Sequence, residues 1–305
     1  GGTPSGRLQG VEQEGEKTMG KIVIVGSGPA GCSAALYAAR AGQEVVVISM
    51  GMGALSKAEL IQNYYGFEEG ITGAELYRQG VAGAKAVGAE FITAEVVGLD
   101  YTGSLVVQTT EGDYPADAVI LATGAGRIAP KIAGLAEHEG RGVSYCATCD
   151  AFFYRGKTAA VLGSGEYALH EVQALLPLAG KVILCTNGEP LTADFPEGVE
   201  ICTEKLAAVE GEEKVSALRL ENGELLPGGG LFVALGVAGS AALARKLGAP
   251  VENGRIVVDE RMQTGIPGLY AAGDCTGGLL QVCKAVYEGA LAATEAIKML
   301  RGKKR

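Results

Sequence analysis

The amino-acid sequence predicts an α/β protein with two Rossmann-like domains. An apolar segment, a glycine-rich turn and a helical segment follow one another from residue 21, and the same order returns from residue 157. In such βαβ units the ligand lies where the glycine turn meets the helix. The repeat therefore predicts two nucleotide-type domains.

The first unit is the stretch "KIVIVGSGPAGCSAALYAARAGQEVVVIS". Residues 21–25 are a short apolar run, typical of a buried strand. Residues 32–41 have a helical pattern that stops at Gly42, and residues 44–49 form a second apolar strand. Residues 105–125 then read as strand, turn and strand, and include the fully buried segment "AVILATG". These elements predict the first parallel sheet.

The second unit is "KTAAVLGSGEYALHEVQALLPLAGKVILCTN". Residues 200–236 follow it as a β-rich segment, with turns at Glu212–Glu213 and Asn222–Gly223. Residues 255–275 contain another buried strand, and residues 283–300 have the pattern of an amphipathic helix. The chain therefore predicts a second sheet, and then a return to the first.

Composition excludes several classes of protein. The net charge of −9 argues against a nucleic-acid partner, and no apolar run approaches the ~20 residues of a membrane span. Seven scattered cysteines in an acidic chain favour a reducing compartment, so we expect the cytoplasm. Residues 1–18 are polar and lack periodicity, which indicates a disordered extension or an expression remnant.

The first glycine motif, "GSGPAG" at residues 26–31, follows a strand and opens a helix. Gly26 allows the tight turn, Gly28 lets the backbone approach a pyrophosphate, and Gly31 lets helix and strand pack closely. The amide groups at the start of the helix favour an anion. In this context the motif predicts a dinucleotide site.

The second glycine motif, "GSGEYA" at residues 163–168, has an acid inside the loop, at Glu166. A 2′-phosphate needs lysines or arginines after the next strand, and none lies between Lys181 and Lys205. This charge pattern disfavours NADP. NAD, with Glu189 as a poor partner for its ribose diol, and a domain without any nucleotide both remain open.

Two further stretches have the composition of cofactor contacts. "LATGA" at residues 121–125 is a strand end that turns near the first site, with Thr123 and Gly124 at the turn. "GLYAAGDCTGG" at residues 268–278 places Gly273 and Asp274 between a strand and a helix. A carboxylate at that point is suited to accept a hydrogen bond from a ribityl hydroxyl group.

The stretch "SYCATCDAFF" contains two cysteines three positions apart, Cys146 and Cys149. A metal clamp would need further ligands, but the chain has two histidines and no second CxxC. A structural disulfide with so short a loop gains little entropy. A redox-active dithiol fits best, because closely spaced cysteines exchange readily with a partner disulfide. Asp150 is placed to donate or take a proton.

The order of "GSGPAG", "ATGA", "CATCD", "GSGxxA" and "AAGDC" resembles the low-molecular-weight thioredoxin reductases, from about Lys21 to the final helix. The resemblance implies FAD as cofactor, a thioredoxin-like partner and a homodimer. It implies an FAD-binding domain formed by residues 19–127 and 254–305, and an inserted domain at residues 128–253 that carries the redox motif.

The resemblance also assigns residues. Cys149 faces the flavin, Cys146 attacks the partner's disulfide, and Asp150 is the associated acid. Tyr65 replaces a usual proline near the flavin-side asparagine, and Ala151 replaces a glycine after the acid. The predicted FAD contacts are Gly26, Gly28, Pro29, Ala30, Gly31, Asn63, Thr123, Gly124, Gly273, Asp274 and Gln281.

The departures from the family concern the electron donor. Its HRRxxxR motif, which grips the 2′-phosphate of NADPH, falls on residues 185–191, and here these read "CTNGEPL". An expected GxxP turn reads "GVAG" at residues 236–239. We therefore expect a donor other than NADPH, with ferredoxin first and NADH second. A flavin dithiol oxidase that uses oxygen, and a flavin-bound redox sensor without turnover, are alternatives of other classes.

Overall fold

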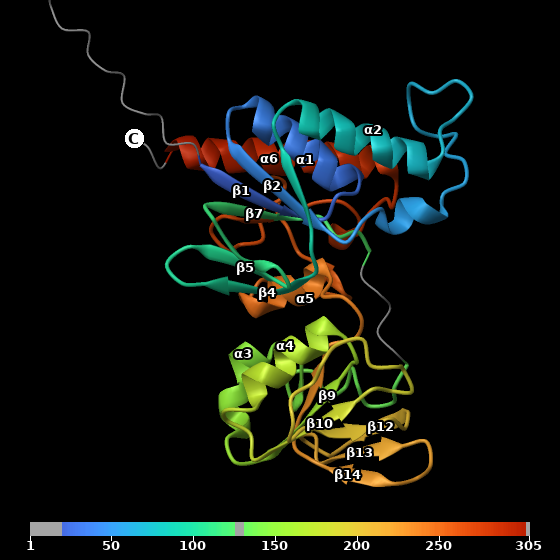
Figure 1. The fold of residues 1–305 in the computed structure, drawn as a ribbon, viewed down its shortest axis with the longest axis vertical. Coiled ribbons are helices and arrows are strands. Elements are labelled where there is room, and N and C mark those ends of the chain that lie inside the picture. Colours follow the sequence, from blue (N-terminus) through green and yellow to red (C-terminus); the bar gives the residue numbers. More distant parts are fainter. Residues whose placement is uncertain (1–19, 126–130, 303–305) are drawn as a thin grey trace, which may run out of the picture.

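Two five-stranded parallel sheets form the frame of the computed structural model, which describes residues 20–125 and 131–302 (Figure 1). In the first sheet the strands are β18 (Leu269–Ala271), β7 (Ala118–Leu121), β1 (Lys21–Val25), β2 (Glu44–Ser49) and β3 (Glu90–Thr93), in that order. In the second they are β11 (Glu200–Cys202), β10 (Lys181–Cys185), β9 (Thr158–Leu162), β15 (Leu231–Val233) and β8 (Val143–Ser144). The predicted α/β class with two Rossmann-like units is confirmed.

Helices cover one side of the first sheet, namely α1 (Pro29–Arg40), α2 (Gly73–Ala86) and α6 (Val282–Gly302) (Figure 1). Helices α1 and α6 cross at very short range, since a Cβ atom on Gly289 would lie 2.1 Å from the carbonyl oxygen of Ala30. Helix α1 begins three residues before the expected start, because Pro29 occupies its first turn, where a missing N–H costs nothing.

Three small antiparallel units complete the fold. A three-stranded sheet made of β4 (Val96–Tyr101), β5 (Leu105–Thr109) and β6 (Gly112–Ala116) lies on the other side of the first parallel sheet (Figure 1). The second unit consists of β12 (Leu206–Glu210), β13 (Ala217–Leu220) and β14 (Leu225–Pro227), and the third is the hairpin of β16 (Val251–Glu252) and β17 (Arg255–Ile256). The β-rich character expected for residues 200–236 is therefore found.

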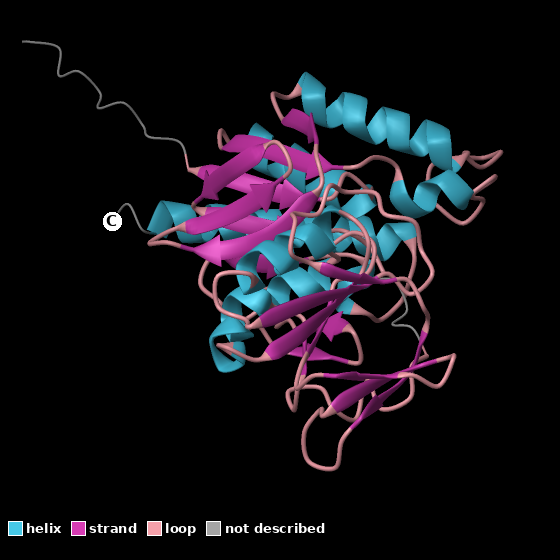
Figure 2. Cartoon of the chain, turned by 60° about the horizontal axis from the view of Figure 1, so that its bottom comes forward, coloured by secondary structure: helices cyan, strands magenta, loops and turns pink. Residues whose placement is uncertain are grey.

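The two large sheets are separated by helices, as the rotated view shows (Figure 2). Helix α4 (Glu166–Leu175) packs on β9 and β10 of the second sheet and also contacts β4, whereas α5 (Ser240–Lys246) packs on β4 and on the β16–β17 hairpin. One hydrophobic cluster runs through both layers and includes residues of α4 and α5. Because α5 packs with the first layer, we propose that the chain returns to that layer near Gly239, earlier than the expected boundary at residues 253–254.

The crossing between the layers is fixed by hydrogen bonds between Thr123 and Ser240. The two hydroxyl groups lie 2.7 Å apart, and the amide of Ser240 donates to the hydroxyl of Thr123 at 2.8 Å. The expected disordered extension at residues 1–18 lies outside the described residues.

Candidate active site

Cys146 and Cys149 form a disulfide at the start of α3 (Ala147–Asp150), with their Cα atoms 5.3 Å apart. The amide of Cys149 donates to the Sγ atom of Cys146 at 3.1 Å. Cys146 is 5% exposed, whereas Cys149 is open to solvent. An amide donor stabilises a thiolate, so once the disulfide is reduced the geometry favours Cys146 as the nucleophilic sulfur.

Asp150 is linked to the cysteines through Ser144, a residue that the sequence did not single out. The hydroxyl of Ser144 donates to Oδ2 of Asp150 at 2.7 Å and accepts from the amide of Cys146 at 3.1 Å. The carboxylate therefore orients the backbone at the first cysteine. The path ends at a backbone amide and not at a sulfur atom, so the expected role of Asp150 in proton transfer stays a prediction.

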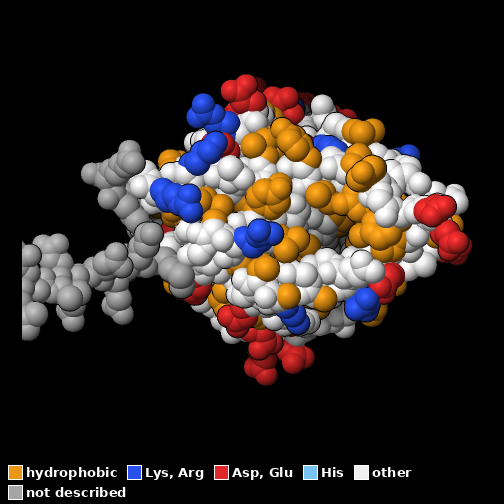
Figure 3. All heavy atoms as spheres, turned by 90° about the horizontal axis from the view of Figure 1, so that it is seen from above, with side chains coloured by type: hydrophobic (Ala, Val, Ile, Leu, Met, Phe, Trp, Pro, Cys, Tyr) orange, Lys and Arg blue, Asp and Glu red, His pale blue; other side chains and the backbone are white. Residues whose placement is uncertain are grey.

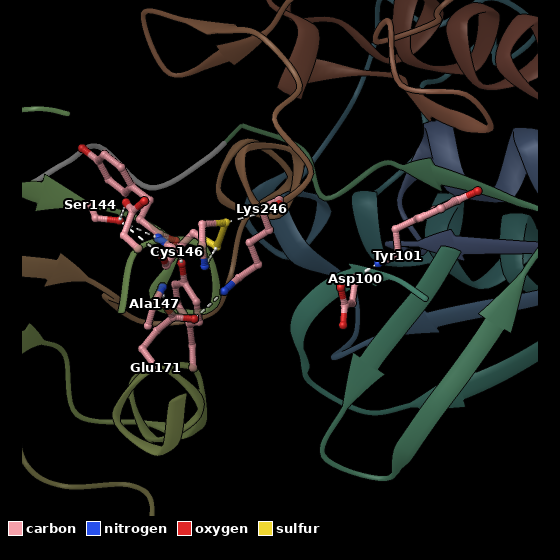
Figure 4. The surroundings of a disulfide bond; sticks show 11 residues. Asp100, Tyr101, Ser144, Cys146, Ala147, Glu171 and Lys246 are labelled. Atoms are coloured by element: carbon pink, nitrogen blue, oxygen red, sulfur yellow. Dashed lines mark hydrogen bonds and ion pairs between the residues drawn. A yellow bond between two sulfur atoms is a disulfide. The ribbon is translucent and has the colours of Figure 1, made fainter. Parts of the chain in front are cut away.

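Two further residues that sequence reasoning missed lie beside the disulfide. Glu171 of α4 and Lys246 of α5 form a buried ion pair, and the Sγ atom of Cys149 lies 3.4 Å from the carbonyl oxygen of Lys246 (Figure 4). One signal was available, since Glu171 interrupts an otherwise apolar stripe formed by Ala168, Val172 and Leu175.

The first glycine motif forms a cradle with free space in it. A Cβ atom on Gly31 would lie 1.8 Å from the carbonyl oxygen of Gly26, and Gly26 itself has φ +109°. A Cβ atom on Gly28 would meet nothing within 4 Å. Gly31 and Gly26 are thus required by packing, whereas Gly28 leaves room in front of the first amides of α1, which begins with Pro29 and the buried Ala30. These residues fit the pyrophosphate of FAD.

The structure brings together two predicted flavin contacts that are far apart in the chain. The side-chain amide of Asn63 donates to Oε1 of Gln281 at 2.9 Å. Residues 62–68 line a cavity of about 580 Å³ at this point. Asn63 therefore lines an open hollow, and its hydrogen bond places Gln281 beside it.

The loop that carries Gly273 and Asp274 packs on the start of α1, because a Cβ atom on Gly273 would lie 3.0 Å from that of Ala30. An ion pair that the sequence analysis overlooked holds this loop. Glu288 accepts from the amide of Gly273 at 2.8 Å, and Lys284 donates to the carbonyl oxygen of Gly273 at 2.8 Å. Gly124 has φ +77°, so the turn after β7 needs a glycine.

The second glycine motif is covered by the chain itself. The amide of Thr192 donates to the carbonyl oxygen of Ser164 at 2.9 Å, and a Cβ atom on Gly165 would lie 3.0 Å from the hydroxyl oxygen of Thr192. An open cavity of about 610 Å³ remains beside it, lined by Glu166, Leu191, Thr192, Ala193, Asp194, Phe195 and Ile201. Its two charged residues are acids, which disfavour a phosphate.

One basic residue lies closer to this site than the sequence suggested. A Cβ atom on Gly188 would lie 3.2 Å from Cε of Lys205, so the lysine side chain passes over the turn after β10. Along the chain, residues 182–204 contain no lysine or arginine. In the folded protein, Lys205 adds one ammonium group to the turn after β10, which also contains Glu189.

The remaining cysteines behave as packing residues where they are buried. Burial raises the pKa of Cys32 and of Cys185 to about 12, and that of Cys275 to about 11. These groups are therefore thiols, and not the more reactive thiolates, at neutral pH. Cys283 is exposed. Within residues 20–125 and 131–302, no three His, Cys, Asp or Glu side chains form a group suited to a metal ion.

In the described part of the chain no helix combines the length and the apolar character that a membrane crossing requires. Residues 20–289 match the family model described as pyridine nucleotide-disulphide oxidoreductase. A thioredoxin reductase of Aquifex aeolicus is 35% identical over 308 residues, which cover 93% of this chain and 94% of the relative.

Two solved structures extend this comparison. The atypical thioredoxin reductase TRi of Desulfovibrio vulgaris Hildenborough has a TM-score of 0.87 and 40% identity, with 93% of this chain and 99% of that chain covered. A ferredoxin-flavin thioredoxin reductase of Clostridium acetobutylicum has a TM-score of 0.71 and 35% identity, with the same coverage. With its glycine cradle and cysteine pair, the chain belongs to the pyridine nucleotide-disulphide oxidoreductases, as an FAD-dependent disulfide oxidoreductase of the thioredoxin reductase type.

Proposed function

We propose that the protein reduces the disulfide of a thioredoxin-like protein through Cys146 and Cys149. The observation that carries this proposal is the disulfide itself, which lies at the start of α3 and belongs to one buried and one exposed cysteine. Bound FAD supplies the electrons. Cys149 is the sulfur that receives them, and Cys146 attacks the partner's disulfide. Because Cys146 is 5% exposed, the CATC segment must shift before the attack.

The partner is expected to dock beside the disulfide on an exposed aromatic surface. Phe152 and Phe153 follow α3 directly and are 65% and 67% exposed. The guanidinium group of Arg155 lies 5.1 Å from the ring centre of Phe152. Large exposed aromatic side chains with an arginine are typical of protein interfaces, so this edge of the second layer is suited to a protein substrate.

We propose ferredoxin as the electron donor. Thr192 covers the second glycine motif, and Glu166 and Asp194 make its surroundings unfavourable for a phosphate. A protein that carries single electrons needs access to the flavin edge and no nucleotide pocket. The name of the Clostridium acetobutylicum relative, a ferredoxin-flavin thioredoxin reductase, supports the same choice. NADH is the second candidate, because it lacks the 2′-phosphate.

Anaerobic reduction of the flavin separates these donors. We expect reduced ferredoxin to bleach the flavin absorbance of the oxidised protein within the mixing time, and NADPH to leave it unchanged over minutes. The matched control is a thioredoxin reductase that uses NADPH, treated in the same cell. Rapid bleaching by NADPH would refute this choice of donor, and rapid bleaching by NADH alone would establish the second candidate.

A dithiol oxidase is the second function that these residues allow, because the exposed Cys149 is accessible to a small thiol. Such an enzyme would use the same cysteines in the opposite direction and would pass the electrons to oxygen. Accumulation of hydrogen peroxide with a dithiol substrate in air, without a need for ferredoxin, would favour it. We keep the cytoplasm as the proposed location, on the grounds of the cysteine pattern.

We also propose a homodimer formed through the first layer. Hydrophobic side chains are spread over the face that carries α1, α2 and α6 (Figure 3). Tyr37 of α1 and Tyr287 of α6 are 54% and 63% exposed. Exposed aromatic groups on one face indicate an interaction surface. Light scattering that gives the mass of one chain at micromolar concentration would exclude the dimer.

A further inference from the structure

A buried ion pair joins the two layers next to the redox disulfide. Glu171 belongs to α4 of the second layer, and Lys246 ends α5, which packs with the first layer. Their side chains are 1% and 2% exposed, and the ammonium group donates to Oε1 of Glu171. Burying two charges costs several kcal/mol per ion before their attraction offsets it, so such a pair adds little stability. A role other than stability is therefore expected.

Both partners also contact the CATC segment, Glu171 through its carboxylate and Lys246 through its backbone carbonyl group (Figure 4). The amide of Ala147, the residue after Cys146, donates to Oε2 of Glu171 at 2.5 Å. The carbonyl oxygen of Lys246 lies 3.4 Å from Sγ of Cys149. The carboxylate of Glu171 thus accepts a hydrogen bond from the first amide of α3. Cys146, where the thiolate would form, lies at the same end of this helix.

We propose that Glu171 and Lys246 are positioning residues whose opposite charges set the acidity of the Cys146 thiol. The inference rests on the proposed redox role of Cys146 and Cys149. Reduction of their disulfide takes two electrons from the flavin and two protons, and it breaks the S–S bond to give two thiols. Each thiol then loses its proton to solvent at its own pKa. The pair acts on that last step, because one fixed charge opposes the thiolate and the other favours it.

The sign of each contribution follows from its charge. The carboxylate of Glu171 accepts from the amide of Ala147, the residue next to Cys146, so its negative charge opposes a thiolate there and raises the pKa of that thiol. Lys246 attracts the thiolate and lowers the pKa. A change to either residue leaves the other charge unpaired in the same place, so the two single variants must shift the pKa in opposite directions.

Other charged and titratable groups lie around the CATC segment and also influence the acidity of the Cys146 thiol. Asp150 is in α3 itself, Tyr167 and His170 are in α4, and Arg245 is in α5. Burial lowers the pKa of His170, and Lys246 lowers it further, so this imidazole is neutral in the pH range of the thiol. Burial raises the pKa of Tyr167 strongly, so it stays protonated there. Asp150 and Arg245 are present in every variant described below, so they form a constant background.

The test measures the pKa of Cys146 in the FAD-loaded protein with Cys149→Ser, from the ultraviolet absorbance of the thiolate against pH. Cys146→Ser in the same protein gives the background of the other cysteines. We expect Glu171→Gln to lower the pKa by about one unit and Lys246→Met to raise it by about one unit. The double variant Glu171→Gln/Lys246→Met is expected to return close to the starting value.

A second readout uses the protein with both cysteines. At a pH above the pKa of the thiol, Glu171→Gln is expected to raise the equilibrium constant for reduction of the disulfide about tenfold. This is a rise of ~30 mV in the reduction potential of a two-electron couple, measured in equilibrium with a dithiol buffer. Lys246→Met is expected to have the opposite effect. Lys181→Met, which breaks the exposed Lys181–Glu200 pair, is the matched control and should change neither quantity.

These outcomes separate the inference from a purely structural role. A structural role would lower the melting temperature in both single variants and shift the pKa in neither or in the same direction, and that result would overturn the proposal. If a single variant does not fold, Glu171→Asp keeps the charge but withdraws it from Ala147, and it should lower the pKa by a smaller amount. Failure of the proposed function appears separately, as turnover that survives Cys146→Ser.

Discussion

Replacing Cys149 with serine is expected to abolish the reduction of a thioredoxin-like protein, by about a thousandfold or more. The disulfide can no longer form, so no electrons reach the surface of the protein through the CATC segment. Cys146 stays free and keeps the amide of residue 149 as a donor. It should therefore attack an oxidised partner and hold it as a stable mixed disulfide. Steady-state turnover and gel electrophoresis without reductant measure the two effects.

Cys146→Ser is the matched variant. It should abolish turnover to the same extent, but it should form little mixed disulfide, because the remaining Cys149 is assigned to the flavin. The assignment of the two sulfurs is reversed if Cys146→Ser traps the partner and Cys149→Ser does not. Cys283→Ser, which alters an exposed cysteine outside the motif, should keep full activity and so controls for general effects of thiol removal.

Gly31→Ala is expected to destabilise the FAD-binding layer, whereas Gly28→Ala is expected to weaken FAD binding alone. A Cβ atom on Gly31 would overlap the carbonyl oxygen of Gly26 at 1.8 Å, which forces α1 away from β1 and should cost roughly 3 kcal/mol or more. A Cβ atom on Gly28 meets no protein atom within 4 Å, and its φ of −71° suits alanine. It fills only the space through which a pyrophosphate approaches.

The melting temperature of the FAD-free protein and the dissociation constant of FAD distinguish these two variants. Gly28→Ala should melt within about a degree of the unaltered protein and bind FAD at least tenfold more weakly, or ~1.4 kcal/mol. Gly31→Ala should melt well below it. Gly83→Ala is the control for FAD affinity, since a Cβ atom there also meets nothing within 4 Å and lies in α2, away from the motif. As a glycine inside a helix, it should gain up to ~1 kcal/mol of stability on this change and melt slightly higher. Unchanged FAD affinity in Gly28→Ala would show that the pyrophosphate binds elsewhere.

The sequence predicted the elements of both parallel sheets because each is encoded locally, by an apolar strand, a glycine turn and a helical period. It named Asn63 and Gln281 as flavin contacts only through resemblance, and it did not predict their hydrogen bond, because no local pattern links residues in such distant segments. The ion pair of Glu171 and Lys246 escaped prediction for the same physical reason. Its partners belong to different layers, and only the packing of α4 against α5 brings them together.

The position of Lys205 beside Gly188 was also beyond the reach of sequence order. Along the chain, Lys205 is separated from Gly188 by 16 residues. In the fold, the chain that leads into β12 brings its side chain back over the turn at Gly188. The return of the chain to the first layer was expected at residues 253–254, between the two strands of the β16–β17 hairpin. Packing of α5 on β4 is a tertiary contact, and periodicity cannot reveal it.

The ion pair between the layers has a consequence for how easily they separate. An apolar contact of the same size loses roughly 25 cal/mol for each Å² that is exposed to water when the layers part. Glu171 and Lys246 instead regain their hydration, which repays much of the attraction that is lost. The contact therefore specifies one orientation of the layers without making that orientation costly to leave. A reductase whose buried Cys146 must become accessible during each cycle can use such a reversible closure.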